Sequence, residues 1–531
     1  MSEHAKPAEQ KPLNPERYTA IDELNRHSWY LDGDSQSQVI HVDSSIADAG
    51  APRVMANKYN DSADIVDAAK AANRLMRHPL AGNMSTARDP NGDYYGPQDL
   101  PSEERPADAR ANMIRHLENL DIDPASVRIL HPNRDYTTAL AVVDVDHDPA
   151  TYDGIEPAKL EGEGDMIYTY NPNIVLGVRP ADCPLVVFNA ETPKGEITIM
   201  VHFAWQGAAA QQVKDMQGEL EKLEVDLSTA KIYMTPGGHS ETFPYENYAA
   251  DPRKKFPDTE GLFNDVEPHE TDGKTKYNFT IDTPYFVYEG LLGMGLDPYQ
   301  IFVDTSDTTA PESGYSSHSR QWRLDDTNTR DLVTVKIEKP KSLVASNPDR
   351  PTPPEIEWQI VPLEVEYIDF DGNLQQGTIE VNRDVYDDVK AFFEKALELK
   401  YPIEKVVKSS DTEYQWDDDK MMAANTSSGF NYRLIKDTDR PSLHGLGRAF
   451  DINTRLNPFI RHKDGVTAID PPDGVYDPSL PGVLTTDHPL VLFMKERGWE
   501  WGGDWAKDVD EDGNYRIDYQ HFQKKPPEIA S

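Results

Sequence analysis

A proline-rich segment near the middle of the chain divides the sequence into two parts. Between Ile337 and Trp358 the sequence reads IEKPKSLVASNPDRPTPPEIEW, with prolines at 340, 348, 351, 353 and 354. Proline lacks a backbone donor and restricts φ, so this segment favours extended backbone. The length of 531 residues also exceeds what one hydrophobic core usually organises. We therefore expect a linker at 338–358 between two domains.

The part before this segment alternates strand patterns with helix patterns. Two apolar runs flank a polar turn in NIVLGVRPADCPLVVFNAETPKGEITIMVHF, and QGAAAQQVKDMQGELEKL follows with apolar residues at helical spacing. This order favours a layered α/β domain over 79–337. Residues 1–78 show weak periodicity, apart from a short helical stretch near SADIVDAAKAANRLM, and are expected to form an N-terminal extension.

The part after the linker predicts a hairpin followed by a helix. The stretch LEVEYIDFDGNLQQGTIEV turns at Asp371-Gly372-Asn373, which is a turn-forming sequence between two alternating runs. The next segment places six apolar residues on one helical face: Val385, Val389, Phe392, Phe393, Ala396 and Leu397. We expect an α+β domain over 359–531.

Charge and cysteine content restrict the partners and the compartment. The chain has 53 basic and 93 acidic residues, a formal net charge of -40, which repels nucleic acid and anionic membrane surfaces. No apolar run reaches eighteen residues, and the first residues lack the pattern of a secretion signal. The single cysteine, Cys183, excludes an internal disulfide and fits a reducing compartment. We therefore expect no nucleic acid or membrane partner. We also expect a cytoplasmic location, although release to the cell wall by another route stays possible as an alternative. The sequence does not define the oligomeric state.

The segment SLHGLGRAFDIN, residues 442–453, carries a histidine and an aspartate in a run of small residues. A zinc site for hydrolysis needs three nitrogen or oxygen ligands and one position open to water. His444 and Asp451 are two candidate ligands, and His521 in DYQHF is a third. Asp518 precedes His521 by three residues, a spacing that suits a general base beside a ligand.

This segment resembles the S-x-H-x-x-G-x-A-x-D pattern of the M15 zinc peptidases, the D-alanyl-D-alanine carboxypeptidase and L-alanyl-D-glutamate endopeptidase group. Further blocks resemble the same family in order: YQWDDDKMMAANTSSGFNYR, NTRLNPFI, GWEWGGDW and DYQHF. The resemblance implies zinc on His444, Asp451 and His521. It also implies Asp518 as general base and Arg433 facing the substrate carbonyl.

Other residues near these motifs are candidates for substrate contact. Ser442 either bonds a ligand or caps the turn, and Trp501, with Trp499 and Trp505, either walls a substrate cleft or packs in the core. The resemblance favours the cleft for Trp501.

A calcium loop competes for the acidic segment DVDEDGNYRID. Asp508, Asp510 and Asp512 precede Gly513 as in the first half of an EF-hand loop. Position twelve is Tyr519 instead of glutamate, which favours a plain acidic turn that delivers Asp518.

In the N-terminal part, Cys183 and His202 each stand at the end of a predicted strand, where a thiolate and an imidazole can share a metal. The segments ADCPLVVF and HFAWQGAAAQQV resemble the A-D-C-x-P and H-A-G-W-R-G blocks of the YfiH family, also called laccase-domain or polyphenol oxidase proteins. The resemblance implies a zinc or copper site of His131, Cys183 and His202, an arginine-rich block with Arg320, and chemistry on purine nucleosides or misassembled cell-wall precursors.

Four departures weaken this second resemblance: Gln206 replaces the arginine of the family block, Ala204 replaces its glycine, Cys183 is followed directly by proline, and Ile129-Leu130 replace the glutamine-valine before the first histidine. An anion-binding arginine is then missing, which argues against phosphorolysis.

Taken together, these patterns predict a zinc-dependent peptidase acting on peptidoglycan stem peptides, of L-Ala-D-Glu or D-Ala-D-Ala type, fused to a metal-binding YfiH-like domain. Two alternatives stay open. The chain is a noncatalytic binding or structural assembly protein that retains both folds, or its N-terminal half is the working enzyme.

Overall fold

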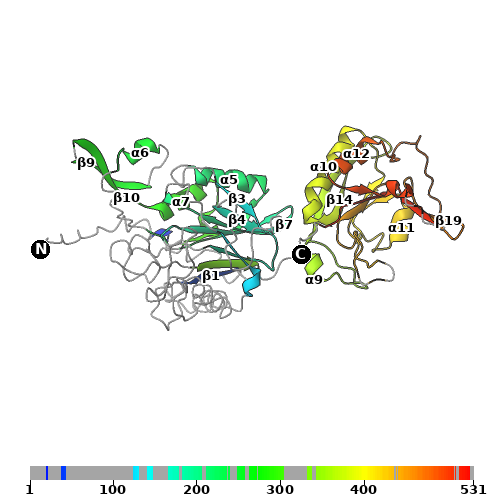
Figure 1. The fold of residues 1–531 in the computed structure, drawn as a ribbon, viewed down its shortest axis with the longest axis horizontal. Helices are drawn as coiled ribbons and strands as arrows, with labels where there is room; N and C mark the ends of the chain where they lie inside the picture. The colour runs from blue at the N-terminus through cyan, green and yellow to red at the C-terminus, as the bar shows by residue number, and fades with distance from the viewer. Residues whose placement is uncertain are drawn as a thin grey trace. The chain divides into compact units, whose positions relative to one another are not determined.

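The computed structural model divides the chain into two compact units. Unit 1 comprises Met1–Thr192 and Glu196–Pro340, and unit 2 comprises Pro193–Gly195 and Lys341–Ser531. The structure describes residues 20–21, 38–43, 123–130, 140–146, 165–178, 182–205, 211–235, 237–238, 248–256, 262–271, 273–303, 332–337, 342–435, 438, 440–507, 509 and 513–526. Figure 1 traces both units along the chain. None of the helices in these described ranges is long and apolar enough to cross a membrane.

Unit 1 contains two larger sheets and a hairpin within its described ranges. The first sheet has the order β11 (Ile301–Val303), β8 (Asp226–Met234), β6 (Leu185–Thr192), β7 (Gly195–His202), β4 (Met166–Thr169) and β3 (Val142–Asp144). The second has the order β1 (Gln38–Asp43), β12 (Leu332–Ile337), β5 (Val175–Val178) and β2 (Val127–Leu130). The hairpin joins β9 (Phe263–Thr271) to β10 (Lys274–Ile281). Both larger sheets mix parallel and antiparallel neighbours.

The core of unit 1 joins the first sheet to two helices. Helix α5 (Gln212–Lys222) contributes Met216 and Leu220, and α7 (Thr283–Gly293) contributes Val287 and Leu291, to one buried cluster with β4, β6, β7 and β8. A third described helix is α6 (Pro252–Lys255). The helix predicted from apolar spacing after β7 is confirmed as α5. Strand β1 lies inside the expected N-terminal extension and pairs antiparallel with β12, so this part of the extension belongs to a sheet.

Unit 2 combines short sheets with three longer helices among its described elements. Its helices are α9 (Pro354–Glu357), α10 (Tyr386–Glu398), α11 (Asp418–Ala423) and α12 (Pro489–Glu496). Its strands are β13 (Ile360–Ile368), β14 (Leu374–Asn382), β15 (Lys405–Val406), β16 (Thr426–Ser427), β17 (Ala449–Asp451), β18 (Phe459–Lys463), β19 (Val466–Asp470), β20 (Glu500–Trp501), β21 (Tyr515–Asp518) and β22 (His521–Gln523). They form the sheets β13-β14, β15-β16, β17-β22-β20 and β19-β18-β21.

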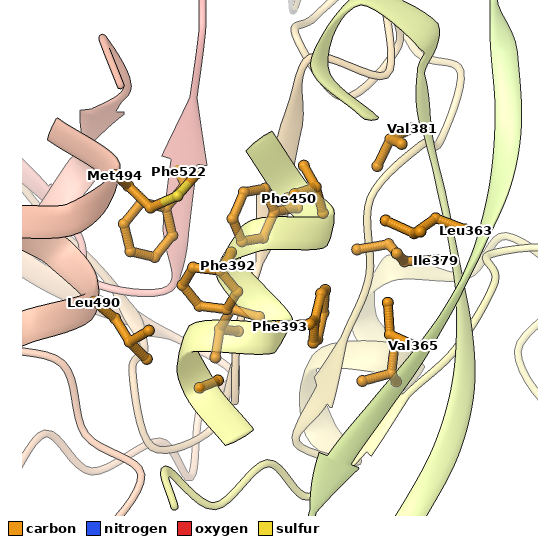
Figure 2. Packing of buried hydrophobic residues seen from close by; sticks show 14 of the residues in the cluster. Leu363, Val365, Ile379, Val381, Phe392, Phe393, Phe450, Leu490, Met494 and Phe522 are labelled. Atoms are coloured by element: carbon orange, nitrogen blue, oxygen red, sulfur yellow. The ribbon is translucent and has the colours of Figure 1, made fainter. Parts of the chain in front are cut away.

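The predicted hairpin and helix of unit 2 are confirmed. Strands β13 and β14 pair from Ile360 opposite Asn382 to Ile368 opposite Leu374, and Gly372 in the turn has a φ of 83°. Glycine adopts this left-handed conformation without steric cost. Figure 2 shows α10 between the hairpin residues on one side and residues of α12 and β22 on the other. Phe392 and Phe393 of α10 are both buried in this core.

Most of the segment expected as a linker packs onto unit 2. Val344 and Ile356 are buried in a cluster with Ile360 and Phe430, and α9 begins directly after Pro353. Proline is tolerated at the start of a helix, where its missing donor would have no partner in any case. The described residues of 342–358 are therefore part of unit 2 rather than a spacer.

Candidate metal centre

A pair of short strands sends alternate side chains to the core and to a pocket. In the antiparallel pair β17 and β22, Phe450 lies opposite Phe522 and Asp451 lies opposite His521. The two phenylalanine rings stack at 5.2 Å in the core of unit 2. Because successive side chains on a strand point to opposite faces, Asp451 and His521 share the face away from that core. Both residues line the pocket.

The three predicted ligands converge in this pocket. His444 Nε2 lies 3.1 Å from His521 Nδ1, His521 Nδ1 lies 3.0 Å from Asp451 Oδ1, and His444 Nε2 lies 3.3 Å from Asp451 Oδ2. A tetrahedral zinc ion with bonds of about 2.0–2.1 Å separates its ligand atoms by roughly 3.4 Å. Within the described residues, this is the group of three histidine, cysteine or acidic side chains whose ligand atoms lie within 4.8 Å of one another. The donor set and its spacing fit zinc.

The hydrogen bonds of the two rings decide which nitrogen faces the others. His444 Nδ1 lies 2.8 Å from the carbonyl oxygen of Gly429, and His521 Nε2 lies 3.0 Å from Gln523 Oε1. Both partners are oxygens that only accept, so each of these ring nitrogens donates. If both rings are neutral, the facing nitrogens are acceptors beside an acceptor carboxylate. Either a proton on one of these nitrogens or a metal ion between them can satisfy this group.

Ser442 caps the turn that carries His444. Its Oγ accepts a hydrogen bond of 3.0 Å from the backbone amide of Gly445, and it also lines the pocket. The turn continues with hydrogen bonds from Leu446 to the Ser442 carbonyl and from Gly447 to the His444 carbonyl. Of the two roles considered for Ser442, capping is the one with a hydrogen bond.

The carboxyl groups of Asp451 and Asp518 have pKa values that shift in opposite directions. Burial favours the neutral acid, but for Asp451 the charge of His444 and the hydrogen bonds from His444 and His521 outweigh burial and lower the pKa. For Asp518, burial dominates and raises the pKa to about 6. Asp518 Oδ1 is buried without a hydrogen-bond partner among the described residues, and the side chain lines the pocket. A carboxyl group in this state is suited to accept and release a proton.

Arg433 lines the same pocket as these carboxylates. Its guanidinium pairs with Asp418 at the start of α11, and Asp418 also accepts a hydrogen bond of 2.6 Å from Asn431. Burial lowers the pKa of Arg433, although the charges of Asp451 and Asp518 act in the opposite direction. Sequence reasoning missed Asp418 as the group that orients Arg433. The available signal was Asp417, which caps the helix through the amide of Lys420 and so places Asp418 in its first turn.

The pocket has a volume of about 370 Å³ and draws residues from several elements. Phe459, Asp470 and Asp518 line it as register partners at one end of the sheet β19-β18-β21. Trp505 lines it too, with its ring 5.4 Å from the His521 ring, and Arg516 stacks on Trp505 at 4.7 Å.

Trp501 is not a wall of this pocket. Its side chain is 2 % exposed, belongs to the core cluster with Phe522, and donates a hydrogen bond of 2.9 Å to the Tyr519 carbonyl. Trp499 is buried in the same cluster. Strand alternation explains this correction, since Trp501 lies opposite Phe522 on the core face. Of the three tryptophans considered as cleft walls, Trp505 is the one that lines the pocket.

The predicted site of unit 1 is described in part. The amide of Phe203 donates to the carbonyl of Pro184 at 3.1 Å, so Cys183 and the buried His202 lie at neighbouring strand ends of β6 and β7. His131, Arg320 and Gln206 lie outside the described residues, as do Asp508, Asp510 and Asp512 of the calcium alternative. Ala204 is buried.

The geometry of unit 2 defines a class of site, a two-histidine, one-aspartate metal centre with a neighbouring buried carboxyl group and an arginine. Comparison with known families agrees. Residues 436–524 match a family model of the M15 peptidases described as D-alanyl-D-alanine carboxypeptidase. Residues 99–328 match a family model described as multi-copper polyphenol oxidoreductase laccase.

Comparison with solved structures returns YfiH and DUF152 proteins. The hypothetical protein YfiH of Bacillus licheniformis is 16 % identical, with a TM-score of 0.34, over 44 % of this chain and 81 % of that chain. YlmD from Geobacillus stearothermophilus is 18 % identical, with a TM-score of 0.34, over the same shares. A Neisseria meningitidis protein of the DUF152 family is 17 % identical, with a TM-score of 0.32, over 44 % and 83 %. Comparison with curated proteins gives no match.

Proposed function

We propose that unit 2 is a zinc-dependent peptidase that hydrolyses peptidoglycan stem peptides, at an L-Ala-D-Glu or a D-Ala-D-Ala bond. One observation carries the proposal: His444, Asp451 and His521 meet within hydrogen-bonding distance in a pocket that also holds the buried Oδ1 of Asp518. The match of residues 436–524 to a D-alanyl-D-alanine carboxypeptidase model supports the same reaction class.

Each residue then has a defined part in peptide hydrolysis. A zinc ion held by the three ligands would lower the pKa of water to about 7 and polarise the scissile carbonyl. Asp518 accepts the proton of the attacking water and returns it to the leaving amine. Arg433, oriented by Asp418, donates hydrogen bonds to the oxyanion that develops on the carbonyl.

One basic side chain at the pocket, Arg516, can contact an acidic group of a peptide substrate. Arg516 lines the pocket, with its guanidinium over the Trp505 ring. An arginine in this position can bind a substrate carboxylate through a bidentate pair of hydrogen bonds. Stem peptides carry such groups on D-glutamate and at their C-terminus.

For unit 1 we propose metal binding by His131, Cys183 and His202, with zinc or copper as the ion and nucleosides or cell-wall precursors as substrate. The laccase family match over 99–328 and the neighbouring strand ends of Cys183 and His202 support this proposal. The rival for the whole chain is a noncatalytic binding or assembly protein that retains both folds.

The test combines metal content with peptide cleavage on the full chain. Native protein, His444→Ala and Cys183→Ala are compared for bound zinc and copper and for hydrolysis of L-Ala-D-Glu and D-Ala-D-Ala stem peptides. We expect His444→Ala to lose one zinc and all cleavage, and Cys183→Ala to lose one metal ion and no cleavage. A native chain that binds no zinc and cuts neither peptide favours the noncatalytic rival.

A further inference from the structure

His521 owes its orientation to a side chain, whereas His444 owes its own to the backbone. The backbone carbonyl of Gly429 accepts a hydrogen bond from His444 Nδ1. The acceptor for His521 Nε2 is Gln523 Oε1 at 3.0 Å. Gln523 follows His521 by two residues on β22 and so lies on the same face of that strand, away from Phe522.

A side-chain amide can accept a hydrogen bond from His521 Nε2 only when its oxygen, and not its nitrogen, faces the ring. The amide nitrogen of Gln523 donates to Glu500 Oε2 at 2.7 Å, and Glu500 Oε1 accepts from Lys525 Nζ at 2.8 Å. A carboxylate has no proton to donate, so the NH₂ end of Gln523 must turn toward Glu500 and its oxygen toward His521. Glu500 lies directly opposite Gln523 in the pair β20 and β22.

We propose that Gln523 and Glu500 are positioning residues for the metal centre: together they fix the tautomer of His521 that presents Nδ1 to the metal. Glu500 selects the orientation of the amide, and the amide selects the ring nitrogen that carries the proton. Hydrogen bonds of this kind typically account for 10- to 100-fold in metal affinity. The proposal rests on the proposed zinc site and names residues that neither the ligand motif nor the family match singles out.

The test is a zinc titration against a chromophoric chelator in a Cys183→Ala background, which removes one proposed ligand of unit 1. Gln523→Leu removes the acceptor. The double variant Glu500→Gln with Gln523→Glu exchanges the two groups, conserves net charge and restores an acceptor to His521. Gln375→Leu is the matched control, because Gln375 bonds Asp369 in the remote hairpin turn.

We expect zinc affinity to fall roughly 10- to 100-fold in Gln523→Leu, and to stay near the reference value in the exchanged pair and the control. Imidazole ¹⁵N spectra of the zinc-loaded protein supply a second readout. The signal that His521→Ala removes should report zinc on Nδ1 and a proton on Nε2 in the reference protein and in the exchanged pair, and a mixture in Gln523→Leu. Equal affinity and equal spectra in the reference and Gln523→Leu would overturn the positioning role. Absence of zinc from the reference protein would instead refute the proposed function.

Discussion

Glu380 is a buried carboxyl group outside the metal centre, and it makes the stability of unit 2 depend on pH. Glu380 lies on β14 and is 2 % exposed, and its Oε2 has no hydrogen-bond partner among the described residues. Burial raises the pKa from 4.5 to about 7, while the charge of Lys408 acts in the opposite direction. The folded chain therefore keeps the proton over a pH range in which the unfolded chain releases it.

The sign and size of the effect follow from proton linkage. Below pH 4.5 both states are protonated, and above about pH 7 both are ionised. Between these values the folded state binds more protons, so the free energy of unfolding falls as pH rises. A shift from 4.5 to about 7, at about 1.36 kcal/mol per unit, corresponds to a loss of about 3 kcal/mol across the window. Glu380→Gln cannot ionise, so this loss should vanish in the variant.

The assay is urea unfolding of the full chain with a metal chelator present, near the acidic limit of the window and above its basic limit. Hydrogen exchange of peptides covering β14 and α10 reports unit 2 separately. The difference in unfolding free energy between Glu380→Gln and native protein should grow by about 3 kcal/mol from the lower to the higher pH. Glu366→Gln on the neighbouring strand is the control, because Glu366 is exposed. A difference that stays constant with pH would refute the reasoning.

Three further predictions concern the pocket. In Gly429→Ala, the new Cβ would lie 2.3 Å from the Glu380 carbonyl oxygen, so the loop must move and the Gly429 carbonyl leaves His444. Zinc titration of this variant should therefore show weaker binding. The control Gly218→Ala, which has open space around its Cβ, should bind zinc normally. Trp501→Ala should destabilise unit 2 by roughly 3–5 kcal/mol in urea unfolding. Trp505→Ala should leave the unfolding free energy unchanged and raise KM. The reverse pattern would show that Trp501, and not Trp505, contacts the substrate. Arg516→Gln should raise KM roughly 10- to 100-fold for a stem peptide with a free D-glutamate carboxylate. KM for the D-isoglutamine peptide, which lacks this carboxylate, should change little. An equal rise in KM for both peptides would refute a contact between Arg516 and the carboxylate.

The sequence predicts those parts of the fold whose pattern is long enough to show a period. Each strand of the hairpin β13-β14 spans nine residues and helix α10 spans thirteen, so alternation or helical spacing repeats several times in each. The sheet pairing of β1 with β12 joins segments almost three hundred residues apart, so no local pattern indicates it. Proline density suggested a spacer at 338–358, but Val344 and Ile356 supply the apolar contacts that attach this segment to unit 2.

The convergence of His444, Asp451 and His521 was predictable from donor chemistry and motif spacing, whereas the groups that orient these side chains were not. His444, Asp451 and His521 fit the needs of zinc as residue types, and the pattern around them resembles a known family. Strands β17 and β22 have only three residues each, too few for their register to be read from sequence. Without that register, nothing indicates that Gln523 reaches His521 or that Trp501 faces the core.

The three strands β17, β22 and β20 supply residues both to the core of unit 2 and to its pocket. Phe450, Phe522 and Trp501 point from these strands into the core, and their neighbours Asp451 and His521 point into the pocket. A one-residue slip in the register would exchange the two sets, turning Asp451 and His521 toward the core and the aromatic rings toward the pocket. The large apolar area that the rings bury therefore opposes any slip that would separate Asp451 from His521. The relative position of Asp451 and His521 is thus fixed largely by residues that lie outside the pocket.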